Sequence, residues 1–144
     1  MRSRIVAAVA VVVLVTASFA MAAGSKKIQQ SGSVKGDSGA SVQLVLIKSG
    51  GAPKSVKNFL FKHLRAKCEG TQTRLDRLKL KGAAKIDDGR KFEQAYDLGT
   101  SKVKVEGKAK SDGSRVKGSV KGTTLQVSGA GSCKVPGFDF VTKR

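Results

Sequence analysis

The clearest pattern in this sequence is a strict alternation of small apolar and charged residues in its C-terminal half. Valine, glycine and alanine alternate with lysine and glutamate over residues 102–110, and a similar alternation returns over residues 115–121. Asp112 and Gly113 lie between the two segments, and an Asp-Gly pair tolerates the positive φ angles of a tight turn. The two segments are therefore predicted to form a β-hairpin with one buried and one solvated face.

Two earlier segments also show strand patterns. In residues 41–48 one face is apolar and the other is partly apolar, which predicts a strand covered on both sides or one near the middle of a sandwich. Residues 54–61 alternate again. We expect Phe59 and Phe61 to point inward there, with a bulge or an edge position giving cover to Leu60.

The middle of the chain is more ambiguous. Leucines and aromatic residues in segments 73–81 and 85–97 fit either strands or a helical turn. Frequent glycines favour strands joined by turns, and a short helix within residues 71–85 is the alternative. Residues 124–128 and 138–142 supply two further strands. The whole pattern predicts an all-β fold, a small antiparallel sandwich or barrel of about seven or eight strands.

The N-terminus has the order of a secretory signal peptide. Arg2 and Arg4 precede an unbroken apolar run over residues 5–15, and small residues follow at Ala20 and Ala22. This order predicts a signal-peptide helix that is removed by cleavage near Ala22. A retained anchor is the alternative, because the apolar stretch approaches the length of a membrane span. We therefore expect a secreted, extracellular protein.

The chain that follows the signal peptide is long enough for one domain with a small core. With residues 1–22 as the signal peptide, we expect residues 23–30 to form a flexible mature N-terminus and residues 31–144 to form a single β-rich domain. The 144-residue sequence holds 28 Lys+Arg against 10 Asp+Glu, a net charge of +18. Cleavage lowers this to about +16, because two arginines leave with the signal peptide.

The two cysteines, Cys68 and Cys133, both lie after the cleavage point. An oxidising destination favours a disulfide between them, and two free buried thiols are the alternative. Two cysteines and the lone His63 lack the close spacing that zinc ligands use, so neither a metal nor another cofactor is expected.

Short motifs along the chain recur in an order that is informative as a whole. They are Phe59-Leu60-Phe61, Cys68-Glu69-Gly70, Lys91-Phe92, the two V-x-G strands around Asp112-Gly113, Cys133, Gly137-Phe138 and the terminal Arg144. This order resembles a group of small secreted bacterial all-β domains of unknown function in which two cysteines bracket the hairpin. One departure is that Phe138 follows the last glycine directly, where that group often has an aromatic several residues later. The resemblance implies export, a β-rich fold and one disulfide, and it implies no activity.

Catalytic chemistry has few candidates. Nucleophilic catalysis needs a base and a group that orients it, and His63 is the only imidazole. Asp87 and Asp88 precede a glycine as turn residues do, and with no Trp and one Tyr the stacking platform for sugars is missing. The expectation is a non-enzyme without catalytic residues, and an enzyme that uses His63 is the alternative.

Basic charge is the strongest candidate for function. If the two hairpin strands pair, seven cations share one surface with Glu106 alone among them. They are Lys102, Lys104, Lys108, Lys110, Arg115, Lys117 and Lys121. Such a surface attracts anionic cell-wall polymers, acidic polysaccharides and lipid headgroups, although lysines on a wet face also serve solubility alone.

Specific recognition of nucleic acid is not expected. Lysine outnumbers arginine by 20 to 6 after residue 22, and the hairpin has no aromatic residues for base stacking. The sequence predicts a secreted, non-catalytic β-domain retained at the cell envelope by anionic polymers. A secreted inhibitor or a module that binds an unknown protein partner through loops 48–54 or 134–137 is the other class.

Overall fold

The computed structural model describes residues 24–144, so the predicted signal-peptide helix lies outside the described residues. Every regular element in this range is a β-strand, and there are ten. They are β1 (Lys26–Val34), β2 (Asp37–Ser49), β3 (Ala52–Cys68), β4 (Thr71–Lys85), β5 (Lys91–Asp97), β6 (Lys102–Ala109), β7 (Arg115–Val120), β8 (Thr123–Val127), β9 (Gly131–Val135) and β10 (Phe138–Lys143). The all-β prediction is confirmed, but seven or eight strands was too few.

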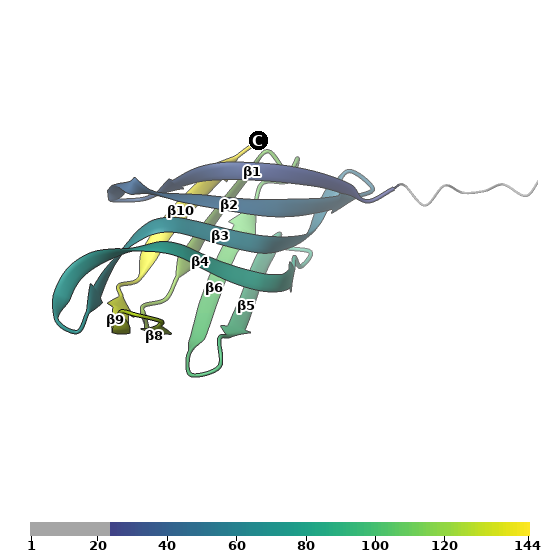
Figure 1. Ribbon diagram of the computed structural model, residues 1–144. Coiled ribbons are helices and arrows are strands. Elements are labelled where there is room, and N and C mark those ends of the chain that lie inside the picture. The colour runs from purple at the N-terminus through teal and green to yellow at the C-terminus, as the bar shows by residue number, and fades with distance from the viewer. Residues whose placement is uncertain (1–23) are drawn as a thin grey trace, which may run out of the picture.

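All ten strands belong to one antiparallel sheet that does not close into a barrel. The order is β5-β6-β7-β10-β1-β2-β3-β9-β8, and β4 pairs with the other edge of β3. Figure 1 shows that the sheet folds over on itself: β1 to β4 cross in front of β5, β6, β7 and β10. We call β1–β4 the front layer and β5, β6, β7 and β10 the back layer. Antiparallel pairing of β1 with β10 carries the sheet from one layer to the other.

The two strands that the sequence did not predict, β1 and β9, lie where the sequence is polar or rich in glycine. β1 begins at Lys26 and pairs with β2, so residues 26–30 are part of the sheet and not a flexible segment. Gly131–Val135 forms β9, where the sequence pattern indicated only a connection. The possible helix in residues 71–85 is instead the 15-residue strand β4. No helix in residues 24–144 has the length and apolar character that crossing a membrane requires.

Aromatic rings from both layers meet in the core. Phe59 of β3 packs against Phe92, Tyr96 and Phe140 of the back layer, with ring centroids 6.0–6.1 Å apart. The hydroxyl of Tyr96 is buried without a hydrogen-bond partner in the described residues, and burial raises its pKa to about 12. This cluster joins the two layers through apolar burial and edge-to-face contacts.

Irregular pairing in β3 explains how the front layer buries its aromatic residues. Asn58 has a positive φ of 56°, and the register on both sides of β3 shifts next to it. The extra residue allows Val56 and Phe59 to face inward although they are three positions apart. Phe59 and Phe61 are both fully buried, as the sequence predicted. Leu60 lies half-buried on the outer face, so the cover expected for it is only partial.

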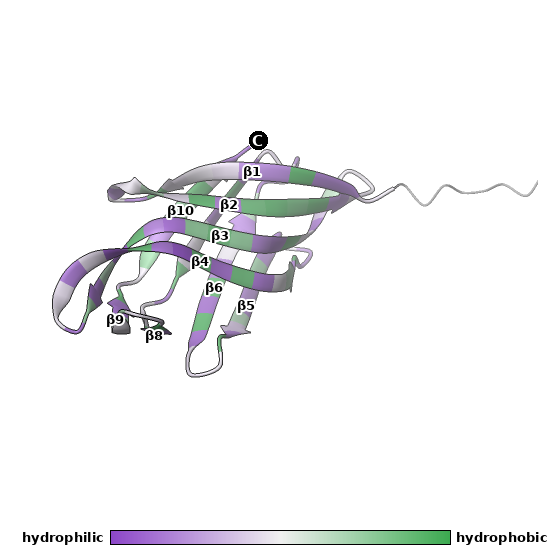
Figure 2. Ribbon diagram, in the orientation of Figure 1, coloured by the Kyte–Doolittle hydropathy of each residue, from purple (hydrophilic) through white to green (hydrophobic). Residues whose placement is uncertain are grey.

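The apolar outer face of β2 is not covered by a second layer. Figure 2 shows that hydrophobic positions continue along β2, whereas β4 and β6 alternate. Val45 and Ile47 are only half-buried, because β2 is shielded from the sides by β1 and β3 but has no element above it. The expectation of cover on both faces was therefore wrong for β2, although its central place in the sheet was anticipated.

The predicted hairpin forms in the back layer as expected. β6 and β7 pair around the Asp112-Gly113 turn, and the register places Gly107 opposite Gly118. These glycines continue an inward row in which Phe92 lies beside Gly107 and Phe140 lies beside Gly118. A Cβ on Gly107 would lie 2.6 Å from Cζ of Phe92, so the absence of side chains makes room for the aromatic rings.

The cysteines form the predicted disulfide. Cys68 at the end of β3 lies directly opposite Cys133 in β9, with the Cα atoms 4.0 Å apart. Both residues are buried. The bond closes a sequence separation of 65 residues and attaches the β8–β9 hairpin to the far end of the front layer.

Two polar clusters hold the turns of the sheet in place. The buried Gln30 amide donates to the carbonyl of Gly113 at 2.6 Å and accepts from the Thr142 hydroxyl at 2.7 Å, which fastens the Asp112-Gly113 turn to β1. In the front layer Arg74 donates to both carboxylate oxygens of Asp37 at 3.0 and 3.2 Å. This contact ties the start of β2 to β4, and the Arg74 hydrogen bond holds the pKa of Asp37 below its ordinary value.

Candidate anion-binding surfaces

The seven cations predicted for the hairpin follow the outward-facing positions of β6 and β7. Six are exposed and Lys104 is half-buried. Lys108 lies directly opposite Lys117 in the ladder, and the backbone of Lys121 donates to the carbonyl of Lys104. Alternation turns the valines and Ala109 inward, so the outward side is left to the charged residues.

Neighbouring strands add carboxylates that the hairpin alone does not reveal. Glu93 of β5 lies opposite Glu106, and Asp139 of β10 lies opposite Ser119, whose hydroxyl donates to the Asp139 carboxylate at 2.7 Å. The expectation that Glu106 stands alone among the cations was therefore wrong. It counted only two strands, and the outer face is made by four.

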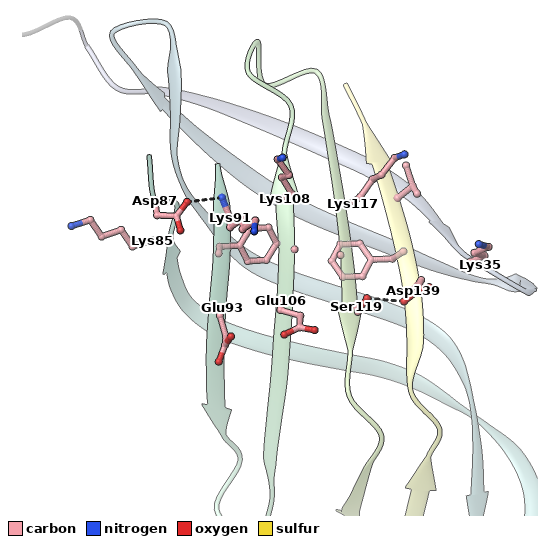
Figure 3. Close-up of a pocket in the computed structure, with 15 residues that line it drawn as sticks. Lys35, Lys85, Asp87, Lys91, Glu93, Glu106, Lys108, Lys117, Ser119 and Asp139 are labelled. Carbon is pink, nitrogen blue, oxygen red and sulfur yellow. Dashed lines mark hydrogen bonds between the residues drawn. The ribbon is translucent and has the colours of Figure 1, made fainter. Parts of the chain in front are cut away.

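The result is an outer face with alternating rows of opposite charge (Figure 3). One row runs through Lys91, Lys108 and Lys117, and the next contains Glu93, Glu106 and Asp139. Between them lies a shallow groove of about 740 Å³. A polyanion laid across this groove meets carboxylates as well as lysines, so the groove attracts it less than the cation count implies.

Lys104 shows this neutralisation directly. Its ammonium group lies 2.5 Å from a carboxylate oxygen of Glu93. The contact lowers the pKa of Glu93 and raises the pKa of Lys104, so both groups stay charged and satisfy each other. Asp112 in the turn behaves similarly: the backbone hydrogen bond from Ser114 lowers its pKa, and Lys110 lies 3.9 Å away.

The front layer holds a larger set of cations that sequence reasoning did not select. β3 and β4 contain ten lysines and arginines but a single carboxylate, Asp76. The ten are Lys54, Lys57, Lys62, Arg65, Lys67, Arg74, Arg77, Lys79, Lys81 and Lys85. The sequence indicates this surface only by the low number of acidic residues over 52–85. Because of the bulges in β3, the alternation along the sequence does not show which of these residues share a face.

Few of these front-layer charges are neutralised. Arg65 and Arg74 both contact Asp37, at 3.6 and 3.0 Å. Lys62 lies directly opposite Arg77, a juxtaposition of like charges that is unfavourable without a counter-ion. The front layer therefore presents more unpaired positive charge than the predicted hairpin.

The remaining candidates do not assemble into a catalytic site in residues 24–144. His63 is exposed at an irregular position of β3 with a φ of 56°, and its backbone carbonyl accepts a hydrogen bond from Arg74. The Asp87 carboxylate accepts one hydrogen bond from the backbone of Lys91, as a turn residue does. The described residues contain no group of three or more metal-ligating side chains.

The two loops proposed for a protein partner are mostly ordered strand. Residues 48–54 form a tight turn at Gly50-Gly51 between β2 and β3, and the Lys48 ammonium donates to the carbonyl of Asp112. Lys134 and Val135 belong to β9, and Val135 is buried. The parts outside the strands are the exposed Gly50-Gly51 turn and Pro136-Gly137, and the partner hypothesis stays a prediction.

Comparisons of this chain with models of protein families, with curated proteins and with solved structures found no match. The resemblance to secreted bacterial β-domains therefore stays a prediction.

Proposed function

We propose that this protein is an exported, non-catalytic β-domain that remains at the cell envelope by binding anionic polymers. The observation that carries the proposal is the shortage of counter-charges. In residues 24–144 only four lysine or arginine side chains contact a carboxylate: Arg65, Arg74, Lys104 and Lys110. Apart from Lys48, which donates to the carbonyl of Asp112, the remaining basic side chains of these residues are available to an external anion. The field of the whole molecule draws polyanions towards it.

The type of basic residue favours contact with many polymers over recognition of one sequence. Lysine is a compact, strongly hydrated charge on a flexible stem, whereas arginine supplies the rigid fork of specific phosphate or base recognition. Lysine dominates on both layers. Binding of this kind weakens steeply with ionic strength, since each bound cation releases counter-ions from the polymer.

A salt gradient on immobilised dextran sulfate tests the proposal. The protein, purified from an exporting host, is expected to elute well above the physiological ionic strength of about 0.15 M. An unmodified dextran column should not retain it, and acetylation of its lysines should abolish retention by removing their charge. Elution at or below physiological salt would reduce the lysines to a role in solubility and contradict the proposed function.

A further inference from the structure

The front layer has a groove of its own on its outer face, of about 730 Å³. Its lining residues belong to β1, β2, β3 and β4, the strands that cross in front of the back layer in Figure 1. Its volume is close to that of the back-layer groove, but its lining is different. The exposed residues that line it are Gln29, Ser31, Gln43, Asn58, Lys79 and Lys81. No carboxylate is among the lining residues.

Sheet register sets these side chains side by side. Ser31 of β1 lies opposite Gln43 of β2, Gln43 lies opposite Leu60 of β3, and Leu60 lies opposite Lys79 of β4. Adjacent strands are about 4.8 Å apart, so the row spans roughly 14 Å. Half-buried Leu60 and Val45 form an apolar floor. The groove therefore combines polar groups on β1 and β2 with the half-buried Val45 and Leu60, and it ends at two lysines on β4.

The bulge in β3 is part of this groove. Asn58, whose positive φ marks the bulge, stands among the lining residues. Bulges often re-aim side chains next to functional sites. Within residues 24–144 the exposed side chains of Gln29, Gln43 and Asn58 make no hydrogen bond to another residue. Their amides are therefore open to a ligand.

The donor and acceptor chemistry of the lining indicates what would bind. An amide offers two N–H donors and a carbonyl acceptor, and a serine hydroxyl both donates and accepts. Sugar hydroxyls can use both kinds of partner. A polymer of phosphate groups uses only donors and would place its oxygens against the amide carbonyls. The two lysines at one end favour a negative charge on the ligand.

We infer that the front-layer groove binds a segment of an acidic polysaccharide, with the amides and Ser31 on sugar hydroxyls and with Lys79 and Lys81 on carboxylates. This inference rests on the proposed function and assigns it a site and a ligand class. The back-layer groove fits this role less well, because four carboxylates line it and offset the charge of its five lysines.

Titration with three probes tests the ligand class. The probes are an oligogalacturonate, its methyl-esterified form, which keeps the sugar but loses the charge, and inorganic polyphosphate. At physiological salt, oligogalacturonate is expected to bind and to shift the side-chain amide NMR signals of Gln29, Gln43 and Asn58. The esterified form should bind at least tenfold more weakly. Polyphosphate should leave these amide signals in place.

Charge-matched variants test the site. Lys79→Gln/Lys81→Gln is expected to weaken oligogalacturonate binding by about tenfold, whereas Lys108→Gln/Lys117→Gln, with the same loss of charge on the back layer, should change it less than twofold. Gln43→Leu keeps the net charge and should weaken binding about fivefold, as loss of a hydrogen bond does. All of the substituted residues are exposed, and urea unfolding checks that each variant keeps its fold.

The outcomes separate the two claims. If both lysine-pair variants lose the same affinity for oligogalacturonate and Gln43→Leu has no effect, the front-layer groove is not the binding site. The proposed binding of polyanions would remain intact. Polyphosphate shifting the same amides would overturn the ligand class. Failure of all anionic probes to bind at physiological salt would overturn the proposed function together with the inference.

Discussion

The front and back layers of this sheet follow the same alternation rule with different results. In the front layer β2, β3 and β4 are 13, 17 and 15 residues long, and β3 is interrupted by residues with positive φ. In the back layer β5, β6, β7 and β10 are six to eight residues long and alternate regularly. The front-layer groove places cations beside amides, whereas the back-layer groove places them beside carboxylates.

The charge of a sheet face is therefore set across strands and not along them. Within β6, three lysines flank one glutamate, and the strand looks strongly basic. Register with β5 adds Glu93 to the same row, and β10 adds Asp139 one strand further. A count of lysines along one hairpin therefore overestimates its attraction for a polyanion.

Removal of the disulfide should have the largest effect on stability, because it anchors the far end of the front layer to β9. The double variant Cys68→Ala/Cys133→Ala is expected to lose about 4 kcal/mol of unfolding free energy, from the added entropy of a denatured chain without the 65-residue closure. Urea unfolding measures the change. The reduced wild-type protein is the control and should match the variant. A loss below about 1 kcal/mol in either would show that packing alone holds this end.

The sequence revealed the back-layer hairpin because each of its signals is local. Valine, lysine and the Asp112-Gly113 turn lie within about twenty residues, and no bulge disturbs the period of two. β1 and β9 could not be predicted, because their glycines, serines and glutamines weaken strand preference. Only pairing with β2 and β3 makes these segments strands.

The candidate site, too, could be predicted only where its signals are local. The seven hairpin cations could be assigned to one face from their spacing. Glu93 and Asp139 could not be added to that face, since their place depends on register between segments far apart in the chain. The front-layer groove was still further from prediction, because the bulge at Asn58 shifts the register on both sides of β3.

A side chain at Gly118 should damage the back layer specifically. Its Cβ would lie 2.7 Å from Cε1 of Phe140 and 2.8 Å from the carbonyl of Glu106, so Gly118→Val forces the core ring and the backbone apart. Valine favours strands intrinsically, and an overpacking loss of about 3 kcal/mol outweighs that preference. Urea unfolding measures this loss. Gly24→Val is the control, because a Cβ at Gly24 meets nothing within 4 Å. Equal stability of the two variants would disprove the packing role assigned to this glycine.

The ion pairs of the two layers should respond differently to acid. The Asp37 carboxylate is buried against Arg74, so Asp37→Asn is expected to lower the unfolding free energy by about 1 kcal/mol at pH 7. Glu93→Gln on the exposed back face should have no measurable effect. Because the pKa of Asp37 is lowered in the folded state, its contribution is complete above the ordinary aspartate pKa of about 4 and is lost as the pH falls through the lower, folded value.

Urea unfolding of wild type and both variants between pH 7 and pH 2 measures this difference. The difference in unfolding free energy between wild type and Asp37→Asn should shrink only below about pH 4. A gap that is constant over the whole range would mean that Asp37 acts through its shape and not through its charge.

The smallest effect is expected when the outer face of the back layer is made to resemble that of the front layer. Glu93→Gln/Glu106→Gln replaces two carboxylates of the acidic row with amides and frees Lys104 from its partner. Binding to dextran sulfate at low salt should tighten about threefold, within the range that exposed charge pairs contribute. Glu69→Gln/Asp88→Asn makes the same change in net charge in two turns outside this row and is expected to have a smaller effect. If both pairs tighten binding equally, net charge alone governs the attraction and the arrangement of rows has no influence.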